Sequence, residues 1–273
     1  MMTTKIVLSV CAILSSVFAC PDHGFHPNTG TTLRKRADGQ DWAYEASFNW
    51  GSINSNYSLC QTGTTQSPIP LLLSQGISLT HTPTFNFPPA STGTWGNWGY
   101  GPGFTLNTNA TEKATVTFQD NNDGNNETAI LKGWHIHAPA DHSVQGDRSK
   151  AELHMVFGDK NGADRAVFAF RIDPGNTESK FFQQLPPMIS WENKTEVKNT
   201  SIQNRLAIAE VNAFAEFWTY RGSLTSPPCR EGIRWYVARN FLFVSNRQMQ
   251  DILAVSTYSA RAEQEVWLHA INV

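Results

Sequence analysis

The stretch Gly133-Trp134-His135-Ile136-His137-Ala138-Pro139 sets two histidines two residues apart within an apolar run. Residues i and i+2 of a β-strand point to the same face of the sheet, so a strand here presents both imidazoles together. A third histidine, His154, follows 17 residues after His137, in Ala151-Glu152-Leu153-His154-Met155-Val156. That spacing leaves room for a loop and a returning strand. We therefore expect the three imidazoles to converge on one face if the two strands pair.

Three neutral histidine ligands with an open fourth position are typical of a catalytic zinc site, whereas structural zinc sites are closed by four ligands. Glu152 lies two residues before His154, shares its face, and can accept the second N–H of a ligand histidine. A pair of histidines two residues apart is a weak signal by itself, and buried histidines without a metal are the alternative. The third histidine and the carboxylate beside it favour the metal site.

The composition is that of an ordinary globular protein. The chain has 273 residues, enough for one large domain or two small ones, with 40% hydrophobic and 16% charged residues and a formal net charge of −2. Lysine and arginine are scattered, without a basic stripe or run. This pattern argues against a nucleic-acid partner and against binding to an anionic membrane surface.

The N-terminus reads as a signal peptide over residues 1–19. Lys5 gives a positive start, residues 6–18 are apolar, and Val17-Phe18-Ala19 fits the small-residue cleavage rule. The apolar run is too short to span a bilayer, and no second run of about 20 apolar residues follows, so we expect no membrane anchor. These features predict a secreted protein.

Residues 20–36 read as a pro-segment that ends in Arg34-Lys35-Arg36, a plausible site for a secretory convertase. A solvated basic patch in a flexible arm fits these residues equally well. The first interpretation leaves one mature domain over residues 37–273, and it removes His23 and His26 from the candidate metal ligands.

The cysteines and sequons fit an oxidising compartment. Cys11 falls in the signal peptide and Cys20 in the pro-segment, which leaves Cys60 and Cys229 as an even pair for a disulfide. Five Asn-x-Ser/Thr sequons stand in polar stretches and predict a glycoprotein. The candidate glycosylation sites are Asn56, Asn109, Asn126, Asn193 and Asn199.

Short apolar runs alternate with turn clusters along the mature region, which predicts a mostly β domain with a few short helices. Turns are expected at 121–124 and 159–162. Ser245 and Gln248 form a capping-box start for a helix through Ala254, and 181–185 and the start of 204–217 have helical patterns. The expected strands cover 115–118, 129–131, 153–157, 166–170 and 235–238.

A second segment with candidate functional residues extends from Trp218 to Cys229. Pro227 and Pro228 stiffen it, and it carries Thr225 and Ser226. A rigid loop of this kind can place a hydroxyl beside a metal-bound water, and Asp141, close after the first histidine pair, offers a carboxylate to orient that hydroxyl. An ordinary Ser/Thr/Pro turn and a buried polar pair are the alternatives.

These motifs, in this order, resemble the α-class carbonic anhydrases, specifically the secreted, eukaryotic-microbial type. The resemblance covers essentially the whole mature region. The motifs that carry it are Asn49-Trp50-Gly51, Gln66-Ser67-Pro68-Ile69, the two histidines of 133–139, Asp141-His142, Ala151-Glu152-Leu153-His154, Tyr220, Gly222-Ser223-Leu224-Thr225-Ser226-Pro227-Pro228 and Trp235. The Cys60–Cys229 pair also resembles the disulfide of secreted members.

The resemblance implies a single domain with a large, mainly antiparallel central sheet and short peripheral helices. It implies Zn²⁺ held by His135, His137 and His154, with Glu152 as the acceptor for His154. Thr225 would hydrogen-bond a zinc-bound hydroxide, and Asp141 stands where the family usually has glutamate. The substrate pocket would be Val156, Val167, Leu224, Ser226, Ile233 and Trp235, residues that without the family would read simply as core.

The implied activity is reversible hydration of CO2 to bicarbonate and a proton, that of a carbonate dehydratase, a zinc lyase. Zinc lowers the pKa of bound water from about 15.7 to about 7, as is long established for carbonic anhydrases, and the hydroxide oriented by Thr225 would attack CO2. The resemblance also implies inhibition by anions and sulfonamides, and the same hydroxide could attack activated esters.

Three positions depart from the family pattern. Asp141 is one methylene shorter than glutamate, so its link to Thr225 is expected to need a backbone shift or a bridging water. Gly133 stands where many members have a glutamine that accepts from the first histidine ligand. Tyr100 occupies the position of the proton-shuttle histidine, and a tyrosine with a pKa of about 10 is a poor shuttle at neutral pH. His81 is a remoter candidate for the shuttle. We therefore expect turnover to be limited by proton transfer.

Two alternatives remain open on the sequence. A zinc-dependent esterase or amidase would need an acid for the leaving group, and no such residue is evident beside the three histidines. A carbonic-anhydrase-like binding or cell-surface module typically lacks a zinc ligand, and all three are present here, but Asp141 keeps this alternative open because a broken Thr225 network would weaken the hydroxide.

Overall fold

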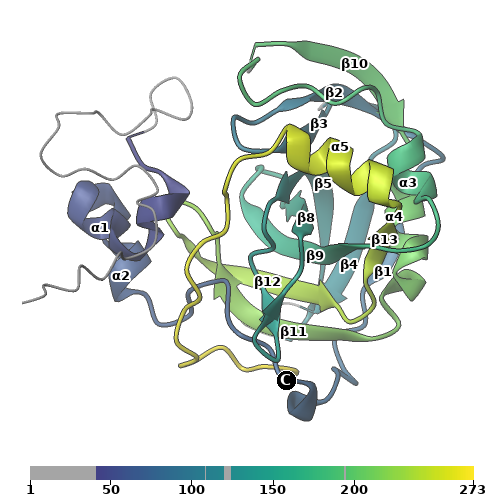
Figure 1. Cartoon of the computed structure of the whole chain (residues 1–273). Coiled ribbons are helices and arrows are strands. Elements are labelled where there is room, and N and C mark those ends of the chain that lie inside the picture. The colour runs from purple at the N-terminus through teal and green to yellow at the C-terminus, as the bar shows by residue number, and fades with distance from the viewer. Residues whose placement is uncertain (1–40, 108, 120–123, 194) are drawn as a thin grey trace, which may run out of the picture. The chain divides into compact units, whose positions relative to one another are not determined.

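The fold is built on an 11-stranded β-sheet (Figure 1). The computed structural model describes residues 41–107, 109–119, 124–193 and 195–273. The main strand order is β10-β2-β3-β5-β8-β9-β12-β11. Outside this order, β4 pairs with β5 and with β1, and β13 pairs with β9. The predicted signal peptide and pro-segment lie outside the described residues. The strands are β1 Thr84–Asn86, β2 Ser91–Asn97, β3 Pro102–Leu106, β4 Thr115–Gln119, β5 Asn126–His137, β6 Ser143–Val144, β7 Asp147–Arg148, β8 Ala151–Gly158, β9 Asp164–Pro174, β10 Val197–Ile202, β11 Phe217–Ser223, β12 Glu231–Ala238 and β13 Leu242–Val244.

The pairing is mainly antiparallel. Only β12 and β13 run parallel to their common neighbour β9 among the described strands, while β6 and β7 form a separate two-stranded sheet. The large, mainly antiparallel central sheet expected from the sequence is confirmed, and each predicted strand falls within an observed one. β4 and β5 pair as expected, although most of their predicted turn lies outside the described residues.

The helices are short and peripheral. They are η1 Tyr44–Asn49, α1 Trp50–Ile53, η2 Ser55–Tyr57, α2 Leu59–Thr62, η3 Leu73–Gln75, α3 Lys180–Gln183, α4 Arg205–Glu210, η4 Asn212–Phe214 and α5 Asn246–Ala254. The capping box of Ser245 and Gln248 starts α5 as predicted. None of the described helices is long and apolar enough to cross a membrane.

The helical pattern expected at the start of 204–217 is confirmed only for α4, which ends at Glu210. The backbone of Asn212, Ala213 and Phe214 has φ values of 55°, 52° and 55°. Three successive left-handed residues cannot continue a right-handed helix. The chain turns there and enters β11 at Phe217.

The two central strands β5 and β8 divide their side chains between the faces of the sheet. Leu153, Met155 and Phe157 pack into the large hydrophobic core on one face. The alternate positions of β8, Glu152, His154 and Val156, point to the other face. A strand covered on both faces reads as a nearly continuous apolar run, as β8 does, and its few polar residues are therefore conspicuous.

An aromatic cluster of Trp42, Tyr44, Trp50 and Tyr100 packs around the Cys60–Cys229 disulfide. The bond joins α2 to the loop after β11, across a sequence separation of 169 residues. The pairing expected from the sequence is confirmed. It ties the N-terminal helices to the segment that carries Thr225.

Replacement of both cysteines by alanine is expected to lower the free energy of unfolding by about 2–5 kcal/mol, because the unfolded chain regains the entropy of a long open loop. Urea unfolding of the double variant and of the wild type measures this difference. Wild type reduced before unfolding should match the double variant. Equal unfolding midpoints for all three would show that the disulfide does not stabilise the fold.

Candidate metal centre

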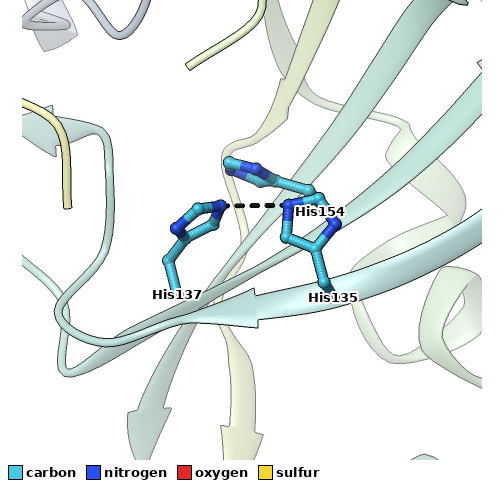
Figure 2. Close-up of side chains that lie close together, drawn as sticks. All are labelled: His135, His137 and His154. Carbon is cyan, nitrogen blue, oxygen red and sulfur yellow. Dashed lines mark hydrogen bonds between the residues drawn. The ribbon is translucent and has the colours of Figure 1, made fainter. Parts of the chain in front are cut away.

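Three imidazoles converge at the centre of the sheet (Figure 2). His135 and His137 share one face of β5, and His154 on β8 stands directly opposite His135 in the register. The candidate ligand nitrogens of the three residues all lie within 4.8 Å of one another. The Nε2 atoms of His135 and His137 are 3.0 Å apart. The convergence is the one that the spacing of the histidines predicts.

Hydrogen bonds orient two of the three rings. Nδ1 of His137 donates to the carbonyl of Ser259 at 2.6 Å, which leaves the Nε2 lone pair facing the other imidazoles. Nε2 of His154 donates to Oε1 of Glu152 at 2.7 Å, which leaves its Nδ1 free as a ligand atom. Glu152 thus lies where the two-residue period of a strand predicts it, whereas no local pattern predicts Ser259.

Glu152 is the hub of a buried polar network. Its carboxylate also accepts from the backbone N–H of His142 at 3.0 Å and from Nδ1 of His142 at 2.6 Å. The hydroxyl of Tyr220 lies 2.7 Å from Nε2 of His142 and donates to Oγ of Ser67 at 3.0 Å. Burial alone would raise the pKa of Glu152, but His142 and then His154 hold it well below its usual value. The carboxylate is therefore a permanently charged acceptor.

A cavity of about 230 Å³ opens over the histidines. Its apolar wall comprises Val156, Val167, Leu224 and Trp235, and Ser226 also lines it. Ile233, expected in the same wall, is fully buried and packs in the apolar cluster behind the cavity. The other lining residues are Trp42, Tyr44, Trp98, Tyr100, His135, His154 and Thr225.

Thr225 and Asp141 are both close to the centre, but no direct bond joins them. Oδ1 of Asp141 accepts from the backbone N–H of Arg261 at 2.7 Å. Its other oxygen, Oδ2, lies 3.7 Å from Nε2 of His137 and has no hydrogen-bond partner within the described ranges. That the shorter side chain of Asp141 needs a backbone shift or a bridging water to reach Thr225 stays a prediction.

His135 is the ligand candidate without an outer acceptor. Its Nδ1 is buried and has no hydrogen-bond partner in the part of the chain that the structure describes. The sequence predicts this gap, because Gly133 has no side chain to fill it. Burial, and then the neighbouring imidazoles of His137 and His154, lower the pKa of His135 well below its ordinary value.

Tyr100 lines the cavity but is poorly suited to move protons. Its ring stacks on His137 at a centroid distance of 5.4 Å, and its side chain is largely buried. Burial, and then the negative charge of Asp141, raise the pKa of Tyr100 further above its ordinary value of about 10. A neutral phenol of this kind does not exchange protons readily at neutral pH.

The chemistry of the donor set fits a borderline-soft divalent cation such as zinc. Burial lowers the pKa of His135 and also that of His137, so both imidazoles are neutral and have lone pairs available. The third, His154, is oriented by a carboxylate, the usual outer partner of a zinc-bound histidine. The cavity reaches this donor set, because His135 and His154 are among its lining residues.

Fold and site together define a class of protein: a mostly β domain with a three-histidine cluster that could hold a metal ion, beneath a small, partly apolar cavity. A family model described as eukaryotic-type carbonic anhydrase matches residues 45–270. The chain therefore belongs to the carbonic anhydrase family, as predicted from its sequence.

Individual relatives agree with this assignment. A carbonic anhydrase of Klebsiella pneumoniae is 30% identical over 216 residues, which cover 76% of this chain and 80% of the relative. A carbonic anhydrase of Pectobacterium atrosepticum is 28% identical over 225 residues, 80% of this chain and 84% of the relative. The fold is similar to that of the α-carbonic anhydrase of Thermovibrio ammonificans solved with sulfanilamide, with a TM-score of 0.67, 24% identity, and coverage of 81% of this chain and 92% of that chain.

Proposed function

We propose that this chain catalyses the reversible hydration of CO2, with Zn²⁺ held by His135, His137 and His154. The observation that carries the proposal is the convergence of three imidazoles, two of them oriented by hydrogen bonds, beneath a cavity with an apolar wall. When bound, zinc supplies Lewis-acid activation of water, for which carbonic anhydrases are themselves the standard example.

The chain's own residues supply the rest of the chemistry. The apolar wall of Val156, Val167, Leu224 and Trp235 provides a dry surface for a small apolar substrate beside the polar floor. Thr225 stands among the lining residues with its hydroxyl available to orient an oxygen nucleophile, and Asp141 Oδ2 is a buried acceptor nearby. Glu152 keeps His154 in the orientation and tautomer that a metal ligand requires.

The test is CO2 hydration by the purified mature protein, followed by stopped flow. The zinc-loaded protein is expected to be active. It should lose this activity after treatment with a chelator and recover it when zinc is added back. Zinc bound at one ion per chain without any hydration above background would refute the proposed reaction. Failure to bind zinc at all would refute the metal assignment.

Proton transfer is expected to limit turnover. The histidines among the described cavity-lining residues are His135 and His154, both proposed ligands, and Tyr100 holds its proton too tightly to shuttle it. Imidazole added to the assay should therefore raise the hydration rate, by about tenfold or more if it replaces a missing acid–base group. A non-titrating salt at equal ionic strength is the control, and a rate that stays flat as imidazole rises would contradict the expectation.

One observation favours a second candidate, a carbonic-anhydrase-like binding module with weak or no activity. Asp141 Oδ2 lacks a partner among the described residues, so the nucleophile-orienting network is incomplete. The Asp141→Glu variant restores the missing methylene and should raise the hydration rate about tenfold, within the range that outer partners of a metal site contribute. Asp141→Asn, which cannot accept as a carboxylate does, should lower it. No response to either change would show that Thr225 acts without this acceptor.

The same site accounts for the other expected ligands. Small anions and sulfonamides would compete at the cavity floor, and the T. ammonificans structure was solved with a sulfonamide inhibitor. Hydrolysis of activated esters would be a side activity of the same centre. No separate acid for a leaving group is among the described cavity-lining residues, which argues against an esterase as the main function.

Secretion and glycosylation complete the proposal. The apolar N-terminus and the Cys60–Cys229 disulfide fit an oxidising, extracellular location. All five sequon asparagines have exposed side chains, so each is accessible to the glycosylation machinery. Mass spectrometry of protein secreted from a eukaryotic host, before and after enzymatic deglycosylation, would identify the mature N-terminus and the occupied sequons.

A further inference from the structure

The three candidate ligand histidines differ in the hydrogen bonds that orient their rings. His137 and His154 each donate their second ring nitrogen, to Ser259 and Glu152 respectively. Nδ1 of His135 is buried without a hydrogen-bond partner in the described segments. A ligand imidazole without an outer acceptor is free to rotate about χ2 and to change its tautomer, and both weaken metal binding. Something other than a hydrogen bond must therefore fix this ring.

No side chain can reach His135 from position 133. Gly133 shares the face of His135 but lies against the neighbouring strand β3, opposite Thr105. A Cβ atom on Gly133 would lie 2.4 Å from the carbonyl oxygen of Phe104. The close approach of the two backbones therefore excludes the acceptor that other members of the family carry here.

An indole contacts the imidazole of His135 instead. Trp98, immediately after β2, stacks on the imidazole of His135 at a centroid distance of 4.7 Å with 27° between the ring planes. The position depends on a second glycine, Gly103, which stands opposite His135 on β3. A Cβ atom on Gly103 would lie 2.5 Å from Nε1 and 2.7 Å from Cδ1 of Trp98. The bare backbone at position 103 thus lets the indole lie against the ligand ring.

We propose that Trp98 is a positioning residue for His135, fixing the plane of this imidazole by stacking in place of a hydrogen-bond acceptor at Nδ1. The inference rests on the proposed zinc site and adds a residue to it. An imidazole bound to a cation becomes electron-poor, and the electron-rich face of an indole stabilises it. The contact is therefore stronger in the metal-bound state, so it favours binding as well as order.

Positioning of His135 by stacking requires an aromatic face at position 98 and does not require the indole N–H. Trp98→Ala should weaken zinc binding about tenfold, the lower end of the range for outer partners of a zinc ligand. Trp98→Phe should retain most of the affinity. Gly103→Ala keeps the indole but displaces it, and should weaken zinc binding in the same direction. Trp267→Ala, which removes an indole that is 70% exposed and not among the cavity-lining residues, is the matched control and should bind zinc as the wild type does.

Two readouts on the full mature protein test this. Zinc dissociation constants come from competition with a chromogenic chelator, and the visible absorption of the cobalt-substituted protein reports the geometry around the ion. Trp98→Ala and Gly103→Ala should change the cobalt spectrum, and Trp98→Phe should resemble the wild type. Wild-type affinity and an unchanged spectrum in Trp98→Ala, or equal losses in Trp98→Ala and Trp98→Phe, would overturn the inference. A wild type that binds no zinc would refute the proposed function instead, so the two failures are distinct.

Discussion

Replacement of His137 by alanine is expected to abolish zinc binding and CO2 hydration together. The Nδ1 bond to Ser259 fixes the free Nε2 of His137 toward the other two imidazoles. Removing this nitrogen leaves two ligands, which cannot complete a three-histidine site. Zinc should fall from about one ion per chain to a small fraction, and the hydration rate should fall by more than about 100-fold, the most that loss of an outer partner alone produces. Elemental analysis and stopped-flow hydration on the same sample measure both.

A second histidine provides the matched control. His81 lies beside Arg234 and the backbone of Val273 and is not among the residues that line the cavity. Its φ of 61° is left-handed, so asparagine is the replacement with a side chain that the backbone tolerates well. His81→Asn should keep its zinc and its activity. A His137→Ala protein that remains folded by near-ultraviolet circular dichroism and still binds a full equivalent of zinc would show that the metal lies elsewhere.

The sequence predicts some of the strands with two covered faces, but not β11, which is also largely buried. β8 and β9 are central strands with long apolar runs, and their positions follow directly from composition. β2 and β10 were not predicted. β10 is the open edge of the main strand order and alternates exposed and half-buried side chains, so it carries no apolar signal. β2 contains two glycines, and a Cβ on one of them, Gly93, would lie 2.3 Å from the carbonyl oxygen of Thr105.

Some residues of the site can be predicted from local sequence patterns, whereas others reach it from distant parts of the chain. The convergence of His135 and His137, and the place of Glu152 beside His154, follow from the two-residue period of a strand. Ser259 could not be found by that rule, because it meets His137 from 122 residues further along the chain. Trp98 likewise has no local signal that links it to His135. Its stacking on His135 depends on the pairing of β3 with β5, which no local pattern reveals.

Glu152→Ala is expected to have the largest effect on both stability and metal binding of any change outside the three ligands. The fully buried carboxylate accepts three hydrogen bonds, two from His142 and one from His154. Its removal leaves those donors buried without an acceptor, and breaking a buried charged network by deleting one partner costs about 3–5 kcal/mol. Urea unfolding should show this loss. Zinc affinity should fall 10–100-fold, because His154 loses the group that fixes its tautomer.

Two comparison variants separate these effects. Glu152→Gln keeps one amide oxygen as an acceptor, so it should retain part of the stability while still weakening zinc binding, because the neutral amide polarises His154 less than a carboxylate does. Glu127→Ala removes a carboxylate that pairs with Arg165 at 2.8 Å in a partly exposed position, and such pairs contribute at most about 1 kcal/mol. Glu127→Ala should therefore unfold and bind zinc nearly as the wild type does. If Glu152→Ala behaved like Glu127→Ala in both measurements, the buried network around Glu152 would contribute neither to the stability of the fold nor to zinc binding.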